Sequence, residues 1–133
     1  MTTRGTAAEG ILLKMLLEHG IEAEHGSPSR PGDIIIPPNV IIEIKDPKEK
    51  SYSFMSHSAK GAKQWSMLKE KKERFPWLEI YYVIRFSRKE WRYFLFPEAV
   101  KPLRLKDGKK LENLFADLLV SQNHFAIAQG GGK

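Results

Sequence analysis

The stretch Arg30-Pro-Gly-Asp-Ile-Ile-Ile-Pro-Pro-Asn-Val-Ile-Ile-Glu-Ile-Lys45 decides how the chain folds. It contains two short β-branched runs, Ile34 to Ile36 and Val40 to Ile44. Between them lies Pro37-Pro38-Asn39, which is typical of a tight turn joining antiparallel strands. The stretch therefore predicts a β-hairpin centred on Pro38.

The register of this hairpin determines which side chains meet. Centring on Pro38 pairs position 36 with 40, 35 with 41 and 34 with 42, so that Asp33 lies opposite Glu43. Side chains alternate along a strand, so Lys45 shares the face of Glu43 while the isoleucines beside it point the other way. Like charges directly opposite each other repel. The two acids indicate a metal site, and the alternative is a half-exposed hairpin whose Glu43 and Lys45 face water.

Length and composition limit the class of protein. The chain has 133 residues, which predicts one domain over residues 1–120 and a flexible tail over 121–133. A formal net charge of +6 favours a polyanionic partner. The absence of cysteine excludes disulfides and thiolate metal sites. No apolar run approaches the ~20 residues of a membrane span and no signal-peptide pattern is visible, so we expect a cytoplasmic protein, either cellular or viral, with no membrane partner.

A first helix is predicted from the N-terminal segment. Thr6 and Glu9 have the spacing of a capping box, and Gly20 is placed to end the helix. The helical stripe comprises Ala8, Leu12, Met15, Leu16 and His19. Glu9 is either a cap or first-turn acid favoured by the helix dipole, or an acid that belongs to a functional site.

The remaining elements alternate between helices and strands. We expect a short strand over 21–24, a polar loop over 25–32, a helix over 58–75, strands over 79–86 and 91–96, and a helix over 109–119. The helix over 58–75 directs Ala59, Ala62, Trp65, Met67 and Leu68 towards a partner surface. Its basic face is either solvated or contacts a polyanion, and it comprises Lys60, Lys63, Lys69, Lys71, Lys72 and Arg74. The order α-β-β-β-α-β-β-α predicts an α/β (α+β) fold with a central mixed sheet of about five strands flanked by helices.

Several motifs resemble those of known nucleases. Asp33, followed after nine residues by Glu43-x-Lys45, resembles the signature of the PD-(D/E)xK nucleases, whose core is restriction-endonuclease-like. Within that superfamily the chain resembles the archaeal Holliday junction resolvases from about Arg4 to Val100. The residues that carry this narrower resemblance are Arg4-Gly5-x-x-x-Glu9, Gly26-Ser27, Gln64 and Trp91-Arg-Tyr-Phe-Leu-Phe-Pro97.

The resemblance implies a Mg²⁺ site, with Mn²⁺ able to substitute and no small-molecule cofactor. Asp33 and Glu43 would be its ligands, joined by the carbonyl of Ile44 and by Glu9, and hard oxygen ligands suit this ion. Lys45 would orient or help deprotonate the attacking water. The remaining matches are Ser27, which would approach the scissile phosphate, and Gln64, which would support the metal site.

The resemblance also implies a homodimer that binds branched DNA and resolves four-way junctions. The residues expected to bind DNA are Arg4, Arg30, Lys48, Lys60 and Lys63. Two positions depart from the family pattern. Gly32 precedes the acid where the family usually has proline, and Ala23 lies near a position that often carries arginine, for which Arg30 is a substitute.

Three alternatives to a junction resolvase stay open. The chain could be another compact nuclease of this superfamily, such as a VRR-type repair nuclease or an exonuclease. It could also be a non-catalytic DNA-binding module that keeps the fold. A plain dimeric scaffold, with no affinity for nucleic acid, is the third.

Overall fold

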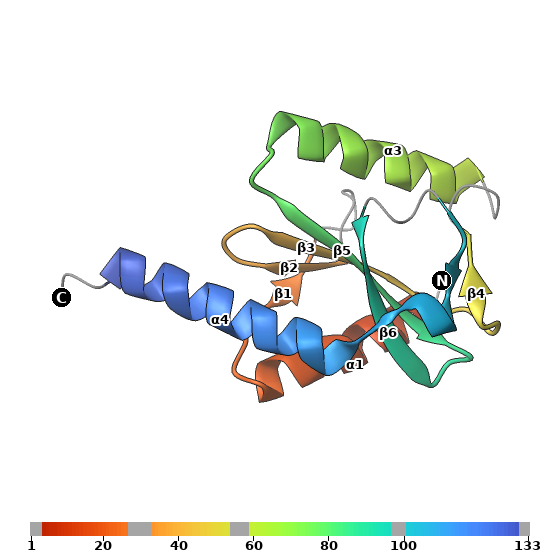
Figure 1. Ribbon diagram of the computed structural model, residues 1–133, viewed down its shortest axis with the longest axis horizontal. Helices are drawn as coiled ribbons and strands as arrows, with labels where there is room; N and C mark the ends of the chain where they lie inside the picture. Colours follow the sequence, from red (N-terminus) through yellow and green to blue (C-terminus); the bar gives the residue numbers. More distant parts are fainter. Residues whose placement is uncertain (1–3, 27–32, 54–58, 97–100, 131–133) are drawn as a thin grey trace.

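The computed structural model describes residues 4–26, 33–53, 59–96 and 101–130. Figure 1 shows helices on both sides of one central sheet, with a small two-stranded ribbon at one end. The elements in chain order are α1 (Arg4–Glu18), β1 (Glu24–His25), β2 (Ile34–Ile36), β3 (Val40–Lys45), β4 (Ser51–Tyr52), α3 (Ala59–Arg74), β5 (Glu79–Phe86), β6 (Glu90–Leu95), β7 (Leu103–Arg104), the 3₁₀ turn η2 (Leu105–Asp107), β8 (Lys109–Lys110) and α4 (Leu111–Gly130).

The central sheet is mixed, as predicted. Its six strands lie in the order β1-β2-β3-β5-β6-β8, and β4 and β7 pair separately as a two-stranded ribbon. Strands β3 and β5 are parallel, while the other neighbours in the sheet are antiparallel. The sixth strand is β8, whose two residues were predicted to begin the last helix.

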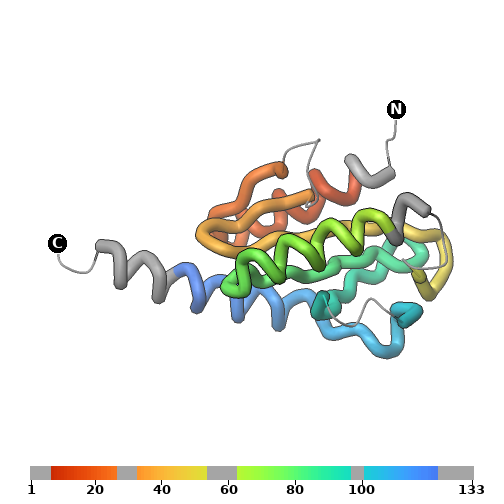
Figure 2. Tube along the Cα trace, turned by 90° about the horizontal axis from the view of Figure 1, so that it is seen from above, coloured from red at the N-terminus to blue at the C-terminus, as the bar shows by residue number. Residues whose placement is uncertain are grey.

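Helices cover both faces of the sheet. Figures 1 and 2 show α1 and α4 on one face and α3 on the other. Each face has its own hydrophobic core. The first combines apolar side chains of α1 and α4 with Ile34, Ile36, Ile42 and Ile44 of the hairpin. The second places Leu68 of α3 against Ile41, Ile80, Tyr82, Ile84 and Phe94 of the sheet.

The predicted hairpin register is confirmed for the three residue pairs of β2 and β3. Strands β2 and β3 pair Ile34 with Ile42, Ile35 with Ile41 and Ile36 with Val40. Just before β2, the Asp33 N–H donates to the Ile42 carbonyl at 2.9 Å. Strand β3 is buried along almost its whole length because it runs between β2 and β5 with helices on both sides.

The end of α1 is also as predicted. Gly20 has φ of +78°, the left-handed conformation that glycine adopts without strain. The Gly20 N–H donates to the Leu17 carbonyl at 3.0 Å and the Ile21 N–H donates to the Leu16 carbonyl at 3.0 Å. This pair of bonds is a Schellman motif, and it turns the chain from α1 towards β1.

Four expectations about the elements are wrong. Helix α1 begins at Arg4, so Thr6 lies inside the helix and does not cap its start. The first strand is Glu24–His25, whereas it was expected over 21–24. Met67 is 39% exposed, so it does not belong to the buried face of α3. The last helix extends from Leu111 to Gly130, whereas it was expected over 109–119. Within this extension, Gln122 Nε2 donates to the carbonyls of Glu22 and Pro37, both at 2.9 Å.

Within the described ranges, no helix combines the length and the hydrophobicity needed to cross a membrane.

The two glycines of the α1 region form a matched pair for a stability test. A Cβ at either Gly10 or Gly20 would meet no atom within 4 Å, so only backbone conformation distinguishes the two sites. Gly20→Ala should destabilise by roughly 1–2 kcal/mol because alanine is strained in the left-handed region. Gly10→Ala, inside an exposed helical turn, should stabilise by about 0.5–1 kcal/mol. Urea unfolding measures both, and equal effects of the same sign would contradict the C-terminal cap described for α1.

Candidate active site

The predicted acids lie at the end of the hairpin remote from its turn. Asp33 stands immediately before β2, and Glu43 and Lys45 stand at the end of β3. Figures 1 and 2 show that α1 and α3 both begin at this end of the molecule. One end of the sheet is therefore where residues from the hairpin and from two helices can meet.

Lys45 is the cation of the site. Its Nζ lies 3.7 Å from Glu43 Oε2 and donates to Gln64 Oε1 of α3 at 2.9 Å. The side chain of Lys45 is 20% exposed and that of Glu43 is 3% exposed. Because Glu43 and Gln64 both contact the Lys45 ammonium group, they restrict the conformation of this side chain at the edge of the core.

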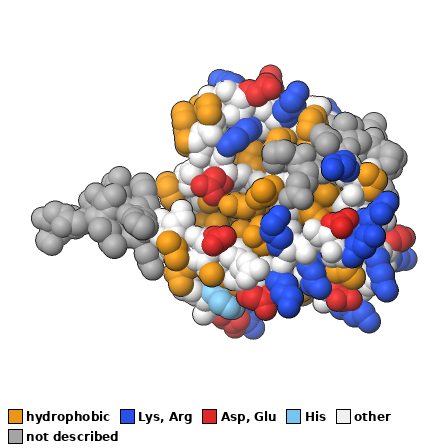
Figure 3. All heavy atoms as spheres, in the orientation of Figure 1, with side chains coloured by type: hydrophobic (Ala, Val, Ile, Leu, Met, Phe, Trp, Pro, Cys, Tyr) orange, Lys and Arg blue, Asp and Glu red, His pale blue; other side chains and the backbone are white. Residues whose placement is uncertain are grey.

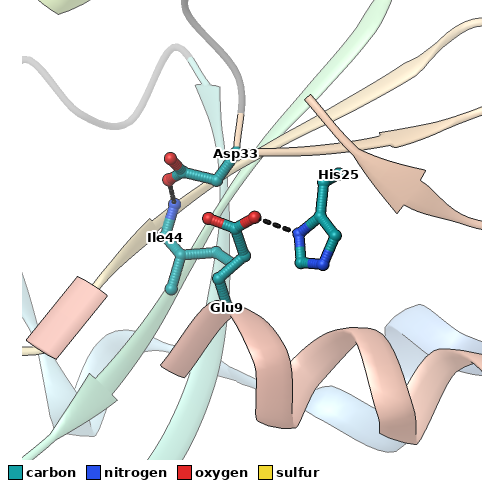
Figure 4. Close-up of polar contacts among 4 residues, drawn as sticks. All are labelled: Glu9, His25, Asp33 and Ile44. Atoms are coloured by element: carbon teal, nitrogen blue, oxygen red, sulfur yellow. Dashed lines mark hydrogen bonds and ion pairs between the residues drawn. The ribbon is translucent and has the colours of Figure 1, made fainter. Parts of the chain in front are cut away.

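Asp33 is held by the backbone of the opposite strand. Its Oδ2 accepts the Ile44 N–H at 2.7 Å (Figure 4). Burial raises the pKa of Asp33, the Ile44 N–H and the Lys45 ammonium lower it, and the Glu9 carboxylate raises it again. The net direction is upward from the ordinary value of 3.8. Both Lys45 of the hairpin and Glu9 of α1 therefore lie close enough to Asp33 to act on it electrostatically.

Glu9 extends the site to the first helix. Figure 4 shows its carboxylate directed towards Asp33 and His25, and its Oε2 accepts a hydrogen bond from His25 Nδ1. Glu9 is thus engaged with groups outside its own helix, which favours the interpretation as a site acid over that of a plain helix cap.

His25 is a member of this group that the sequence did not predict. It belongs to β1, 16 positions from Glu9 in the chain, and its side chain is 58% exposed. The available signal was its place at the start of the polar loop that precedes Asp33. Its pairing with Glu9 depends on β1 joining the sheet edge next to β2, which the sequence alone did not show.

Two tyrosines surround Glu43 on the face covered by α3. Tyr82 is the partner of Glu43 in the β3–β5 register, and Tyr52 belongs to β4. Burial raises the pKa of both phenols, and the nearby Glu43 carboxylate raises each further. Both phenols therefore stay neutral across the physiological range and leave the negative charge on Glu43.

A separate ion pair lies directly beyond Lys45. Arg85 donates to Asp46 twice, from Nε to Oδ1 at 2.9 Å and from Nη2 to Oδ2 at 2.7 Å. The Asp46 side chain is 3% exposed, and its hydrogen bond raises the pKa of Arg85. Asp46 is therefore neutralised by Arg85 and is a structural acid, although it follows the motif directly in sequence.

The other predicted site residues are placed as follows. Lys48 and Lys63 are exposed. Ser27 and Arg30 lie outside the described residues. Arg4 begins α1 and Lys60 lies in the first turn of α3, but their side chains are not among those described.

The donor set fits a hard divalent cation. Asp33 and Glu43 supply carboxylate oxygens, and the pKa of Asp33 is raised by burial and, to a smaller extent, by the Glu9 carboxylate. Among the described side chains, no group of three or more His, Asp or Glu is arranged so that it could hold a metal ion. Mg²⁺ commonly keeps several waters and binds through one or two carboxylates together with a substrate phosphate. Two carboxylates such as Asp33 and Glu43 would suit that mode. Metal ligation by Asp33, Glu43, Ile44 and Glu9 stays a prediction.

Asp33→Asn should stabilise the metal-free protein. A carboxyl whose pKa is raised by folding contributes stability below its ordinary value of 3.8 and loses it as pH rises through the folded-state pKa. Asparagine removes that loss and can still accept the Ile44 N–H. The melting temperature in EDTA should therefore rise at pH 7, and the advantage should shrink towards pH 3. Asp107→Asn, at an exposed position, is the control; an equal gain there, or a gain for Asp33→Asn that does not depend on pH, would contradict this electrostatic account.

Comparisons with known proteins place the fold. Neither protein-family models nor curated protein sequences give a match to this chain. Among solved structures, Hjc from Archaeoglobus fulgidus, a Holliday junction resolvase from an archaeal hyperthermophile, is similar with a TM-score of 0.64 and 21% sequence identity. The similarity covers 86% of this chain and 97% of that chain. The chain therefore has the fold of an archaeal Holliday junction resolvase, consistent with the predicted restriction-endonuclease-like core.

Proposed function

We propose that the protein is a Mg²⁺-dependent endonuclease that cuts four-way DNA junctions. The observation that carries this proposal is the position of Lys45, which lies beside Glu43 and acts electrostatically on Asp33. These residues lie at one end of the central sheet in a chain whose fold is similar to that of a resolvase. Carboxylates with an adjacent ammonium group suit the hydrolysis of a phosphodiester, in which negative charge develops on the phosphate.

Some side chains would hold the metal ion, and others would orient the attacking water. Asp33 and Glu43 would hold the metal, with Glu9 reaching the same centre. A bound Mg²⁺ supplies charge stabilisation at the phosphate and lowers the pKa of a coordinated water. Lys45, directed by Gln64, would orient the attacking water and offset phosphate charge. His25 would hold the carboxylate of Glu9 in place through Nδ1.

Junction resolution also needs two cuts. A homodimer supplies two equivalent sites related by a two-fold axis, which suits paired incision of strands with the same polarity. Recognition would occur through backbone phosphates, because the sequence contains no base-reading motif, and the net charge of +6 supports such contacts. Binding should accordingly weaken steeply with rising salt.

Cleavage assays on defined substrates test the proposal directly. We expect purified protein to cut a mobile four-way junction with Mg²⁺ or Mn²⁺, to be inactive in EDTA, and to cut linear duplex much more slowly. A preference for a flap or a free end would instead indicate a repair nuclease or an exonuclease of the same fold. Equal cutting of junction and duplex would refute the junction specificity but leave a nuclease.

Substitution of the acids separates an enzyme from a binding module. Asp33→Ala and Glu43→Gln should each lower cleavage by at least about 100-fold, because the metal supplies several kcal/mol of transition-state stabilisation. Junction affinity in a gel shift should change little. The exposed acid Glu18, changed to Gln, is the control and should leave cleavage unaltered.

The outcomes distinguish the three alternatives. A DNA-binding module would bind junction in every variant and cut in none. A dimeric scaffold would show no shift even at low salt. Because Glu43 is buried, its variant is informative only with a melting curve, and Asp33→Ala provides the independent measurement.

A further inference from the structure

A two-stranded ribbon lies outside the central sheet and has no part in the proposed chemistry. Strands β4 and β7 pair Ser51 with Arg104 and Tyr52 with Leu103. The Leu105 N–H extends this pairing by donating to the Lys50 carbonyl at 2.9 Å. Two segments that are about fifty positions apart in the sequence are thus held side by side.

The two faces of the ribbon differ in character. Leu103, 3% exposed, belongs to the core beneath α3, and Tyr52 packs against that core. Their neighbours Ser51 and Arg104 alternate to the other face and are exposed. The apolar face fixes the ribbon to the body, and the polar face is presented to solvent on a rigid support.

The polar face forms a basic hollow. A depression of about 410 Å³ is lined by Lys50, Ser51, Arg104, Leu105 and Lys106. Its charged lining consists of two lysines and one arginine, with a serine hydroxyl as a further donor; the nearby acids Glu49 and Asp107 are exposed and do not line it. We call Lys50, Ser51, Arg104 and Lys106 the basic ribbon. Ammonium, guanidinium and hydroxyl donors around one depression are suited to phosphate oxygens.

The basic ribbon lies near the candidate active site. Figure 1 places β4 and β7 at the end of the molecule where α1 begins, and Figure 3 shows many Lys and Arg side chains over that side of the surface. Tyr52 connects the two regions, because the Glu43 carboxylate acts on its phenol from the site while Tyr52 pairs with Leu103 in the ribbon. The basic ribbon and the candidate active site therefore lie at the same end of the molecule.

We infer that the basic ribbon binds the sugar–phosphate backbone of the DNA whose scissile phosphodiester lies at Asp33, Glu43 and Lys45. This inference rests on the proposed function, since it takes the same DNA as substrate. It adds a binding surface outside the set Arg4, Arg30, Lys48, Lys60 and Lys63, and it gives the segment after residue 101 a role. The contact reads no bases, because its donors match phosphate oxygens.

Salt dependence is the property that identifies such a contact. Each phosphate neutralised by Lys or Arg contributes about 0.9 to the slope of log K against log salt on duplex DNA. The variant Arg104→Gln/Lys106→Gln should therefore lower the magnitude of this slope by about 2 and weaken junction binding on the order of tenfold or more at 0.1 M salt. Lys50→Gln should lower the slope by about 1.

A matched variant controls for net charge. Lys14→Gln/Lys110→Gln also removes two positive charges, from exposed positions in α1 and β8. Affinity and slope should be measured by fluorescence anisotropy on a fluorescent four-way junction, with Ca²⁺ in place of Mg²⁺ to prevent cutting. The slope of the control should stay close to that of the unsubstituted protein, and all variants should keep its melting temperature.

The results separate this inference from the proposed function. If the unsubstituted protein binds junction and both double variants weaken it equally, only bulk charge matters and the basic ribbon is refuted. The same holds if the Arg104/Lys106 variant keeps the full slope. If the protein binds junction with a ribbon-dependent slope but does not cut with Mg²⁺, the nuclease proposal fails while the binding surface stands. If it binds no DNA, both fail.

Discussion

The contact between the Lys45 ammonium group and the Glu43 carboxylate is the interaction on which the arrangement depends. A carboxylate with a 3% exposed side chain, within a sheet covered by helices on both faces, loses most of its hydration. Such burial is unfavourable unless the charge is paired and hydrogen-bonded. Lys45 at 3.7 Å offsets part of that cost, and Gln64 in turn directs Lys45. A protein that only needed a stable sheet would be better served by an apolar side chain at position 43.

The fold places the buried Glu43 carboxylate where the hairpin, α1 and α3 converge. The hairpin supplies Asp33, Glu43 and Lys45, α3 supplies Gln64, and α1 supplies Glu9. The two hydrophobic cores on opposite faces of the sheet hold these elements in place. Apolar packing therefore determines the positions of the polar side chains at this end of the sheet. Sites on packed helices and strands are held more tightly than sites on loops, which suits chemistry that requires defined geometry.

What could be predicted from the sequence was decided by local patterns. The hairpin register follows from the turn at Pro38 and from strand alternation, and the end of α1 follows from the conformational freedom of Gly20; neighbours in sequence determine both. Long-range contacts were not predictable in this way. The pairing of His25 with Glu9 needs β1 at the sheet edge. In α4, Gln122 reaches two carbonyls that are distant in sequence. The β4–β7 ribbon joins two dipeptides that are too short to show any periodicity.

The Asp46–Arg85 pair has a consequence for how such sequences can diverge. The two residues are 39 positions apart, and replacing either alone would leave a charge without its partner in a poorly hydrated place, at a cost of about 3–5 kcal/mol. Substitutions at the two positions are therefore expected to occur together, as a reciprocal charge swap or as an apolar pair. Covariation of positions 46 and 85 in distant relatives would indicate that the fold is kept. Position 45, directly beside Asp46, would instead change when the catalytic activity changes.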